Sequence, residues 1–244
     1  MNLMEDDMVT FTVKKQHLVV VAALAVVFVM GFFSGSYFSG SSAAAGATGN
    51  VLGNTGGTLP QYPTTTLGPV QLDTSGAALK GDQNAKVSLV IFEDFQCPFC
   101  ERFTSDALVK IEKDYVDTGK VKLFFKHFPL TQIHPYAQKA SEAAACAQDQ
   151  GKFWEYHDVL FKNQDKLGVD DLKKYAADMG LNTATFNSCL DSGTKKNQVE
   201  KDASDGDTAG VTGTPTIFVN GKPIVGAQPY AAFKAAIDAE LAKA

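Results

Sequence analysis

The chain has 244 residues, of which 45% are hydrophobic and 20% charged, a composition that suits one or two globular domains. Its formal net charge of −5 and its single arginine, Arg102, argue against a nucleic-acid partner. All four cysteines lie beyond residue 96, and an even number of cysteines is readily paired in an oxidising compartment.

An apolar segment follows a short polar N-terminus. Residues 1–17 end in Lys14, Lys15 and His17, and residues 18–38 carry no charge. About 21 such residues can cross a hydrocarbon core of about 30 Å as a transmembrane helix. The positive-inside rule places the N-terminus in the cytoplasm and the rest of the chain outside. The alternative is a cleaved signal peptide with small residues at 43–45, which would release the same exported body.

Residues 39–72 contain no charged side chain and are rich in Gly, Ser, Thr, Ala and Pro. Such a stretch buries too little apolar surface to offset its chain entropy, so we expect a flexible linker. The alternative is an irregular part of the folded body, which begins near residue 73.

The body is predicted to be an α/β domain interrupted by helices. Residues 86–95 form a nearly continuous apolar run typical of a buried strand, and a helix follows from Pro98, with a second strand at 121–128. The crossover is long enough for the two strands to be parallel. No strand pattern occurs in residues 134–210, where helices are expected at 135–150, 152–163, 170–179, 183–190 and 194–209. A hairpin at 216–225 and a helix at 229–243 complete the chain.

The first strand ends at a Cys-Pro-Phe-Cys motif, Cys97 to Cys100. Cys97 is expected at the helix N-cap with Pro98 at the first helical position, where backbone N–H groups and the helix dipole favour a thiolate. We therefore predict Cys97 as the exposed attacking sulfur and Cys100 as the buried resolving thiol. The alternative, half of a zinc site, needs a second ligand pair, and neither the other cysteines nor the histidines show that spacing.

Four motifs in this order carry a family resemblance: Phe-Glu-Asp-Phe-Gln-Cys-Pro-Phe-Cys (92–100), Phe-Pro-Leu (128–130), Gln-Gly-Lys-Phe-Trp (150–154) and Gly-Thr-Pro-Thr (213–216). From about residue 79 onward the chain resembles the DsbA-like thiol–disulfide oxidoreductases of the thioredoxin superfamily, in particular their membrane-anchored or secreted branch. The resemblance implies a thioredoxin fold, built from residues 73–133 and 211–244, with a helical insertion at 134–210.

The resemblance also implies a set of site residues. Pro215 is expected to be cis and to lie beside the two cysteines, and the backbone of Thr214 is expected to pair with an extended substrate. Pro98 and Phe99 are the other expected substrate contacts. The redox-active Cys97–Cys100 disulfide needs no further cofactor and no metal.

Two departures from the family pattern concern the redox chemistry. Phe99 stands where enterobacterial DsbA has His, and it cannot donate a hydrogen bond to the thiolate, so strong oxidising power is not implied. The buried acid that thioredoxin-like proteins often place six residues before the first cysteine is Ile91 here. Glu93 or Asp94 is an alternative proton relay, and the competing interpretation is that both are surface or strand-end carboxylates.

Cys146 and Cys189 fall on different predicted helices of the insertion. We predict a structural disulfide between them, worth about 4 kcal/mol on the loop-entropy model. The alternative is a pair of buried free thiols.

These observations predict an extracytoplasmic, membrane-tethered oxidoreductase that acts on cysteines of exported proteins, most simply as a dithiol oxidase. A membrane reoxidant of the DsbB or VKOR type is the expected redox partner. The same residues would serve a reductase or isomerase, since direction depends on the reduction potential. From another class, the alternative is a non-catalytic metal-binding or chaperone module on the same fold.

Overall fold

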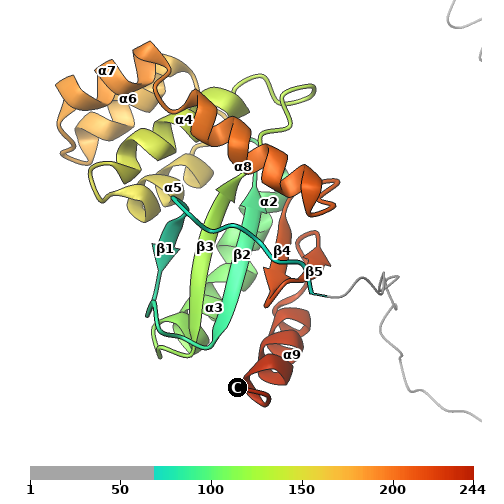
Figure 1. Cartoon of the computed structure of the whole chain (residues 1–244). Coiled ribbons are helices and arrows are strands. Elements are labelled where there is room, and N and C mark those ends of the chain that lie inside the picture. The colour runs from blue at the N-terminus through green and yellow to red at the C-terminus, as the bar shows by residue number, and fades with distance from the viewer. Residues whose placement is uncertain (1–68) are drawn as a thin grey trace, which may run out of the picture. The chain divides into compact units, whose positions relative to one another are not determined.

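The computed structural model describes residues 69–244 (Figure 1). The predicted membrane segment at 18–38 and the predicted linker up to residue 68 lie outside the described residues. No helix within residues 69–244 has the length and apolar character that crossing a membrane requires.

A five-stranded sheet forms the centre of the fold, with the strand order β1-β3-β2-β4-β5. The strands are β1 (Ala78–Lys80), β2 (Val87–Glu93), β3 (Val121–His127), β4 (Thr216–Val219) and β5 (Lys222–Val225). The predicted parallel pairing of β2 with β3 is confirmed, and the other neighbours are antiparallel. Strand β2 lies in the middle of the sheet, which explains its nearly continuous apolar sequence.

The helix that begins at Pro98 runs to Val116 as α2 (Pro98–Arg102), π-helical η1 (Phe103–Leu108), α3 (Val109–Ile111) and π-helical η2 (Glu112–Val116). Its apolar residues recur every four positions, a spacing that drifts around a helix of 3.6 residues per turn but suits wider turns. Phe103 and Ile111 are buried, as the pattern predicts, whereas Phe99 at its start is 53% exposed.

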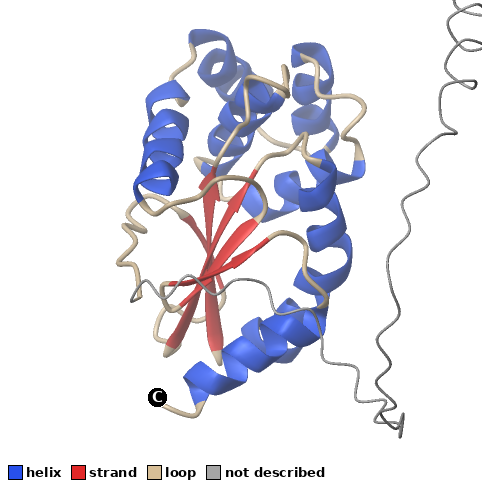
Figure 2. Cartoon of the chain, turned by 90° about the vertical axis from the view of Figure 1, so that its right-hand side faces the viewer, coloured by secondary structure: helices blue, strands red, loops and turns tan. Residues whose placement is uncertain are grey.

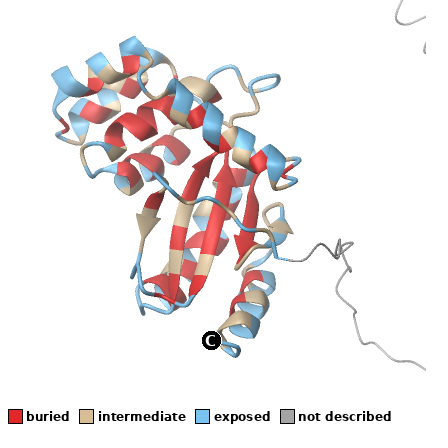
Figure 3. Cartoon of the chain, in the orientation of Figure 1, coloured by how far each residue is buried: buried red, intermediate tan, exposed pale blue. Residues whose placement is uncertain are grey.

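Five helices occupy the region between β3 and β4, close to the predicted ranges: α4 (Ala137–Gln148), α5 (Phe153–Lys162), α6 (Val169–Asp178), α7 (Thr183–Ser192) and α8 (Lys196–Thr208). Helix α8 lies over one face of the sheet, and the helix from Pro98 together with α9 (Tyr230–Leu241) covers the other (Figures 1 and 2). A hydrophobic core lies on each face of the sheet, and successive side chains of β2 point to opposite faces. Leu89 and Ile91 therefore pack into the larger core, and Val90 and Phe92 pack into the core under α8. The central strands β2 and β4 are therefore almost wholly buried and β3 is mostly so, whereas the edge strands β1 and β5 are more exposed (Figure 3).

Residues 70–72, which the sequence assigns to the end of the linker, contact the folded body. Val70 N donates to Gly221 O at 2.9 Å, and Val70 and Leu72 pack against the core under α8. Gly221 has a φ of +79°, and a Cβ there would lie 2.3 Å from Val70 O, so this crossing needs glycine. The composition of this segment did not predict that these two apolar side chains pack against the sheet.

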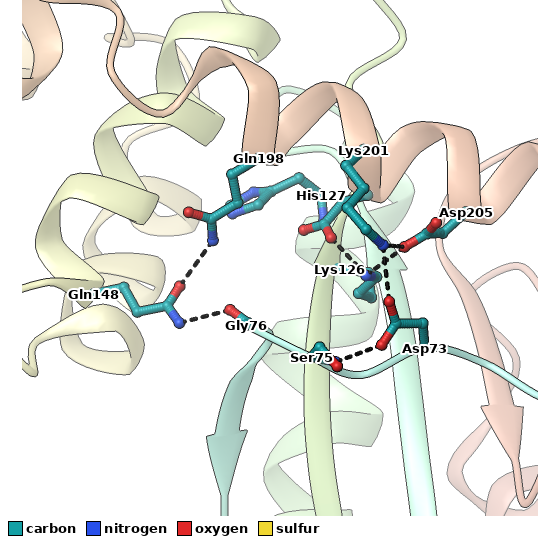
Figure 4. A network of polar contacts seen from close by, with 10 residues as sticks. Asp73, Ser75, Gly76, Lys126, His127, Gln148, Gln198, Lys201 and Asp205 are labelled. Carbon is teal, nitrogen blue, oxygen red and sulfur yellow. Dashed lines mark hydrogen bonds and ion pairs between the residues drawn. The ribbon is translucent and has the colours of Figure 1, made fainter.

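A buried ion-pair network fixes α8 and this N-terminal segment to the sheet (Figure 4). Lys126 Nζ on β3, with its side chain 1% exposed, contacts Asp202 Oδ1 at 2.6 Å and Asp205 Oδ2 at 2.8 Å. Lys201 joins Asp205, at 2.7 Å, to Asp73, at 2.9 Å. Each buried charge is thereby paired, which a lysine inside a sheet requires.

Candidate active site

Cys97 and Cys100 lie where β2 passes into α2, as the sequence predicts. Cys97 occupies the N-cap with φ −77° and ψ 122°, and Pro98 begins the helix. The carbonyl oxygen of Cys97 accepts hydrogen bonds from the N–H groups of Cys100 (3.1 Å) and Glu101 (3.2 Å). Both sulfurs are free thiols in this structure.

The predicted exposure of Cys97 is wrong, because the residue is only 3% exposed; Cys100 is fully buried, as predicted. A loop from the far end of the chain covers Cys97, whose Sγ donates to Thr214 O at 3.5 Å. The Thr214–Pro215 peptide bond in this loop is cis, as the family resemblance implies. The loop therefore lies directly against the N-terminal sulfur.

The two sulfurs have opposite electrostatic environments. A hydrogen bond from the Cys100 thiol lowers the pKa of Cys97 to about 5, against the effect of burial and with help from Thr214 and the backbone N–H groups of Cys100 and Phe99. Burial raises the pKa of Cys100 well above its ordinary value. The Thr214 hydroxyl is buried and has no other partner among the described residues, so it is free to donate to a thiolate. Near neutral pH Cys97 is therefore the thiolate and Cys100 the thiol.

An open cleft of about 560 Å³ lies beside the cis-proline loop that covers Cys97. Its lining comes from the active-site helix, the cis-proline loop and the segment before α9: Phe99, Arg102, Asp106, Thr214, Gly226, Ala227, Gln228 and Pro229. The Arg102 guanidinium lies over the Phe99 ring, 5.2 Å from its centre, and donates to Ala227 O at 3.2 Å. Of the predicted substrate contacts, Phe99 and Thr214 line this cleft, and Pro98 is not among its lining residues.

Asp94 is a buried structural carboxylate, so its interpretation as a surface group is wrong. Its Oδ1 accepts from Gln96 N at 2.7 Å, and its Oδ2 contacts Leu130 N at 2.8 Å and His134 Nδ1 at 2.7 Å. Its own N–H points to Cys100 Sγ at 3.5 Å. Asp94 thus joins the active-site turn to the loop that contains the Phe-Pro-Leu motif.

Glu93 is also fully buried, but on the opposite side of the chain. One carboxylate oxygen faces His157 Nε2 at 3.4 Å, and the other accepts from Thr104 Oγ1 at 3.4 Å. Burial raises the pKa of Glu93, and hydrogen bonding to His157 opposes that shift. The negative charge of Cys97 raises this pKa slightly further, so the Glu93 carboxyl is protonated more readily than an exposed one.

One site residue was not predicted. Gln164, just after α5, donates from Nε2 to the carbonyl oxygens of Phe95 (2.8 Å) and Cys97 (3.0 Å). It holds the turn that carries the motif, yet it lies 67 positions from Cys97, and no local pattern connects the two.

The second cysteine pair is a disulfide, as predicted: Cys146 on α4 is bonded to Cys189 on α7, with a Cα–Cα distance of 6.0 Å. It lies within the helical region and is separate from the Cys97–Cys100 pair. Within residues 69–244, no three or more His, Cys, Asp or Glu side chains are grouped so that they could hold a metal ion.

A dithiol at a helix N-terminus, with one sulfur ionised and a cis-proline loop against it, defines a thiol–disulfide oxidoreductase. Residues 73–239 match the family model described as thioredoxin, and the chain belongs to that family. Within it the chain is a DsbA-like protein-disulfide oxidoreductase, as its relatives show.

Two comparisons support this assignment, and a third supports the fold. Disulfide bond formation protein D of Bacillus subtilis is 34% identical over 185 residues, which are 70% of this chain and 80% of that protein. The crystal structure of oxidised BdbD from the same organism has a TM-score of 0.65 at 32% identity and covers 71% of this chain and 97% of its own. The α-DsbA1 structure of Wolbachia pipientis, with a TM-score of 0.64 at 24% identity, shares the fold over 70% of this chain and 94% of its own.

A matching segment also occurs inside a longer protein. The Na⁺/H⁺ antiporter NhaA 3 of Salinispora tropica is 37% identical over 175 residues, which are 72% of this chain and 26% of the antiporter. The chain therefore spans about a quarter of the length of this relative.

Proposed function

We propose that this protein exchanges disulfides with exported cysteine-containing proteins, chiefly as their dithiol oxidase. The observation that carries the proposal is the contrast between Cys97, with a pKa of about 5, and Cys100, whose pKa is raised. A stabilised Cys97 thiolate favours the reduced form of the enzyme, so electrons pass from the substrate to the Cys97–Cys100 disulfide. Phe99 supplies no donor, but Cys100 and Thr214 supply the stabilisation instead.

The reaction proceeds through a mixed disulfide. A substrate thiolate attacks Cys97 Sγ, the Cys97–Cys100 bond breaks, and Cys100 leaves as a thiolate that takes up a proton. A second substrate thiolate then attacks the first substrate sulfur, which forms the product disulfide and releases the Cys97 thiolate. The cleft bounded by Phe99 and Thr214 gives an extended substrate segment room beside the loop that covers Cys97.

The proposal places the catalytic body outside the cytoplasm and on a membrane. The uncharged run at residues 18–38, preceded by lysines, supports an N-terminal anchor. A membrane reoxidant of the DsbB or VKOR type would return the Cys97–Cys100 dithiol to the disulfide. The second candidate, a reductase or isomerase, uses the same two sulfurs in the opposite direction.

Trapping and a potential measurement test the proposal together. A Cys100→Ser variant should accumulate mixed disulfides with exported proteins through Cys97, whereas Cys97→Ser should accumulate none. Equilibration with glutathione should give a potential nearer to about −120 mV than to about −270 mV, the values of a strong oxidant and of a thioredoxin. Absence of mixed disulfides contradicts the exchange function, and a thioredoxin-like potential contradicts the oxidase direction.

A further inference from the structure

His157 is a histidine enclosed by aromatic rings and contacted by carboxylates at both ends. The residue is fully buried on α5. Five rings surround it with centroid distances between 4.9 and 6.1 Å: Phe95, Phe125, Phe153, Trp154 and Phe161. Such a cage excludes water, so each ring nitrogen depends on the groups placed beside it.

The two nitrogens of His157 face different carboxylates. Nε2 is 3.4 Å from Glu93 Oε2, and Nδ1 is 2.9 Å from Asp158 Oδ1. Glu93 is buried at the end of β2, whereas the Asp158 side chain is 50% exposed. An imidazole can accept a proton at one nitrogen and release one from the other. The three side chains therefore join the protein interior to its surface.

The inner end of this series of side chains lies near Cys100, whose Sγ is 3.5 Å from the N–H of Asp94, the residue next to Glu93. Glu93 accepts from Thr104, one turn beyond Cys100 on the active-site helix, and its negative charge contributes to the raised pKa of Cys100. Asp94, the other buried carboxylate here, already contacts two backbone N–H groups and His134. Asp94 also contacts a partly exposed histidine, His134, but both of its oxygens already accept from backbone N–H groups, whereas neither oxygen of Glu93 does. Glu93 is therefore the carboxylate left free to exchange a proton.

We propose that Glu93, His157 and Asp158 form a proton relay that connects the buried sulfur of Cys100 with solvent at the outer side of α5. The proposal rests on the disulfide exchange proposed above. Each time a substrate dithiol reduces the Cys97–Cys100 bond with its two electrons, Cys100 becomes a thiolate in a site that excludes water. Glu93 gives it a proton and is reprotonated through His157 from Asp158 and solvent.

In the reverse step the proton leaves the Cys100 thiol along the same path. The thiolate then attacks the mixed disulfide at Cys97 and releases the bound thiol. Protons balance over the cycle: a substrate dithiol brings two, of which one remains on Cys100 and one enters solvent, because Cys97 stays a thiolate. The 3.4 Å contact between Glu93 and His157 is long for a resting hydrogen bond, and catalytic hydrogen bonds often shorten only during reaction.

The charged groups around the relay set the pKa values of its members. Although burial opposes it, hydrogen bonding to Asp158 and Glu93 raises the pKa of His157. His127 on β3 faces the same cage, and burial together with Lys126 lowers its pKa to about 3, so it stays neutral. Burial opposes it, but the hydrogen bond and charge of His157 lower the pKa of Asp158, with smaller contributions from Lys80 and Lys162. The Cys97 thiolate supplies the negative charge at the inner end and raises the pKa of Glu93 further, beyond the larger effect of burial.

A two-step reaction of the reduced full chain, in detergent, with glutathione disulfide isolates the relay. In the first step the Cys97 thiolate attacks and forms a Cys97–glutathione mixed disulfide, which needs no proton from Cys100. In the second step Cys100 must lose its proton before it displaces glutathione. Rapid acid quenching and mass spectrometry measure the two rates separately over a pH series.

Loss of the relay should slow only the second step. We expect about a 100-fold decrease in Glu93→Gln and His157→Gln, the lower end of the usual general-base contribution of about 10²–10⁴. Asp158→Asn, at the half-exposed end, should lose about tenfold, because water replaces part of its role. In Glu93→Gln the second rate should rise tenfold per pH unit, since hydroxide then removes the Cys100 proton. The first rate should follow the Cys97 titration in every variant.

Glu155→Gln is the matched control, since it removes a carboxylate that is 54% exposed from the same helix without touching the relay. Asp158→Asn keeps the test informative if the buried variants do not fold. The relay is wrong if Asp158→Asn slows the second step no more than Glu155→Gln, or if first and second steps slow equally. A wild-type chain that forms no Cys97 mixed disulfide refutes the exchange function itself, a distinct result.

Discussion

Replacing Thr214 with valine should raise the pKa of Cys97 and make the protein a weaker oxidant. Valine keeps the shape of threonine but removes the hydroxyl that helps to lower the Cys97 pKa from 9.0 to about 5. A hydrogen bond to a charged group is worth about 1.5–3 kcal/mol, or about one to two pKa units. We expect a Cys97 pKa of about 6–7 in the variant, because Cys100 and the backbone donors remain.

The consequence depends on pH with a definite sign. The folded-state pKa of Cys97 is depressed, so the stabilisation of the reduced form is full above the unfolded pKa and is lost as the pH falls through about 5. At pH 7, two pH units above the Cys97 pKa, ionisation of Cys97 stabilises the reduced form by about 2.7 kcal/mol. Each unit that Thr214→Val removes should make the potential about 30 mV more negative.

Ultraviolet absorbance of the thiolate, recorded during a pH titration of reduced protein, measures the pKa, and equilibration with glutathione measures the potential. Thr216→Val is the control, because the Thr216 hydroxyl donates to Gly213 O at 2.7 Å in the same loop and does not act on the sulfur. An unchanged Cys97 pKa in Thr214→Val, or an equal shift in Thr216→Val, would refute the reasoning.

Three further predictions concern stability and are measured by urea unfolding. Lys126→Met leaves two carboxylates of α8 without their buried partner and should cost about 3–5 kcal/mol, whereas Lys201→Met on the exposed side should cost less than about 1 kcal/mol. Gly206→Ala should cost about 1–3 kcal/mol, since its Cβ would lie 2.6 Å from a phenylalanine ring under α8; an unchanged midpoint would show that this ring can move. Cys146→Ser with Cys189→Ser should cost about 4 kcal/mol, and wild type treated with a reductant should show the same loss if the disulfide is the cause.

The parts of the fold that sequence reveals are those with a strong local pattern. The parallel β2–β3 pair and the helices of the 134–210 region follow from apolar periodicity and glycine punctuation, and their boundaries agree within a few residues. Strand β1 has only three residues and exists through its antiparallel pairing with β3, where Leu79 is opposite Phe124. The same holds for Val70, whose only visible reason to be ordered is contact with a distant part of the chain.

The candidate site divides in the same way. The Cys97 N-cap follows from the motif itself, because a cysteine before Pro98 at a strand–helix junction leaves little choice of geometry. The burial of Cys97 does not follow, since the covering oxygen belongs to Thr214, 117 positions away. The Gln164 side chain is equally remote. Composition and spacing therefore identify the reacting atoms, and tertiary contacts determine their exposure and their pKa.

Glu93 and Asp94 show why two adjacent carboxylates could not be distinguished before the fold was known. Side chains alternate along a strand, so Glu93 continues the face of Leu89 and Ile91 toward the helices, and Asp94 turns toward the loop after β3. Asp94 has its acceptors filled by groups that fix the active-site turn, so Asp94→Asn should disturb both sulfurs and the fold. Glu93 meets only a threonine and a histidine, so Glu93→Gln should affect the Cys100 step far more than the Cys97 thiolate. Asp94 and Glu93 are adjacent in sequence, yet Asp94 holds the active-site turn in place and Glu93 is placed to transfer the proton of Cys100.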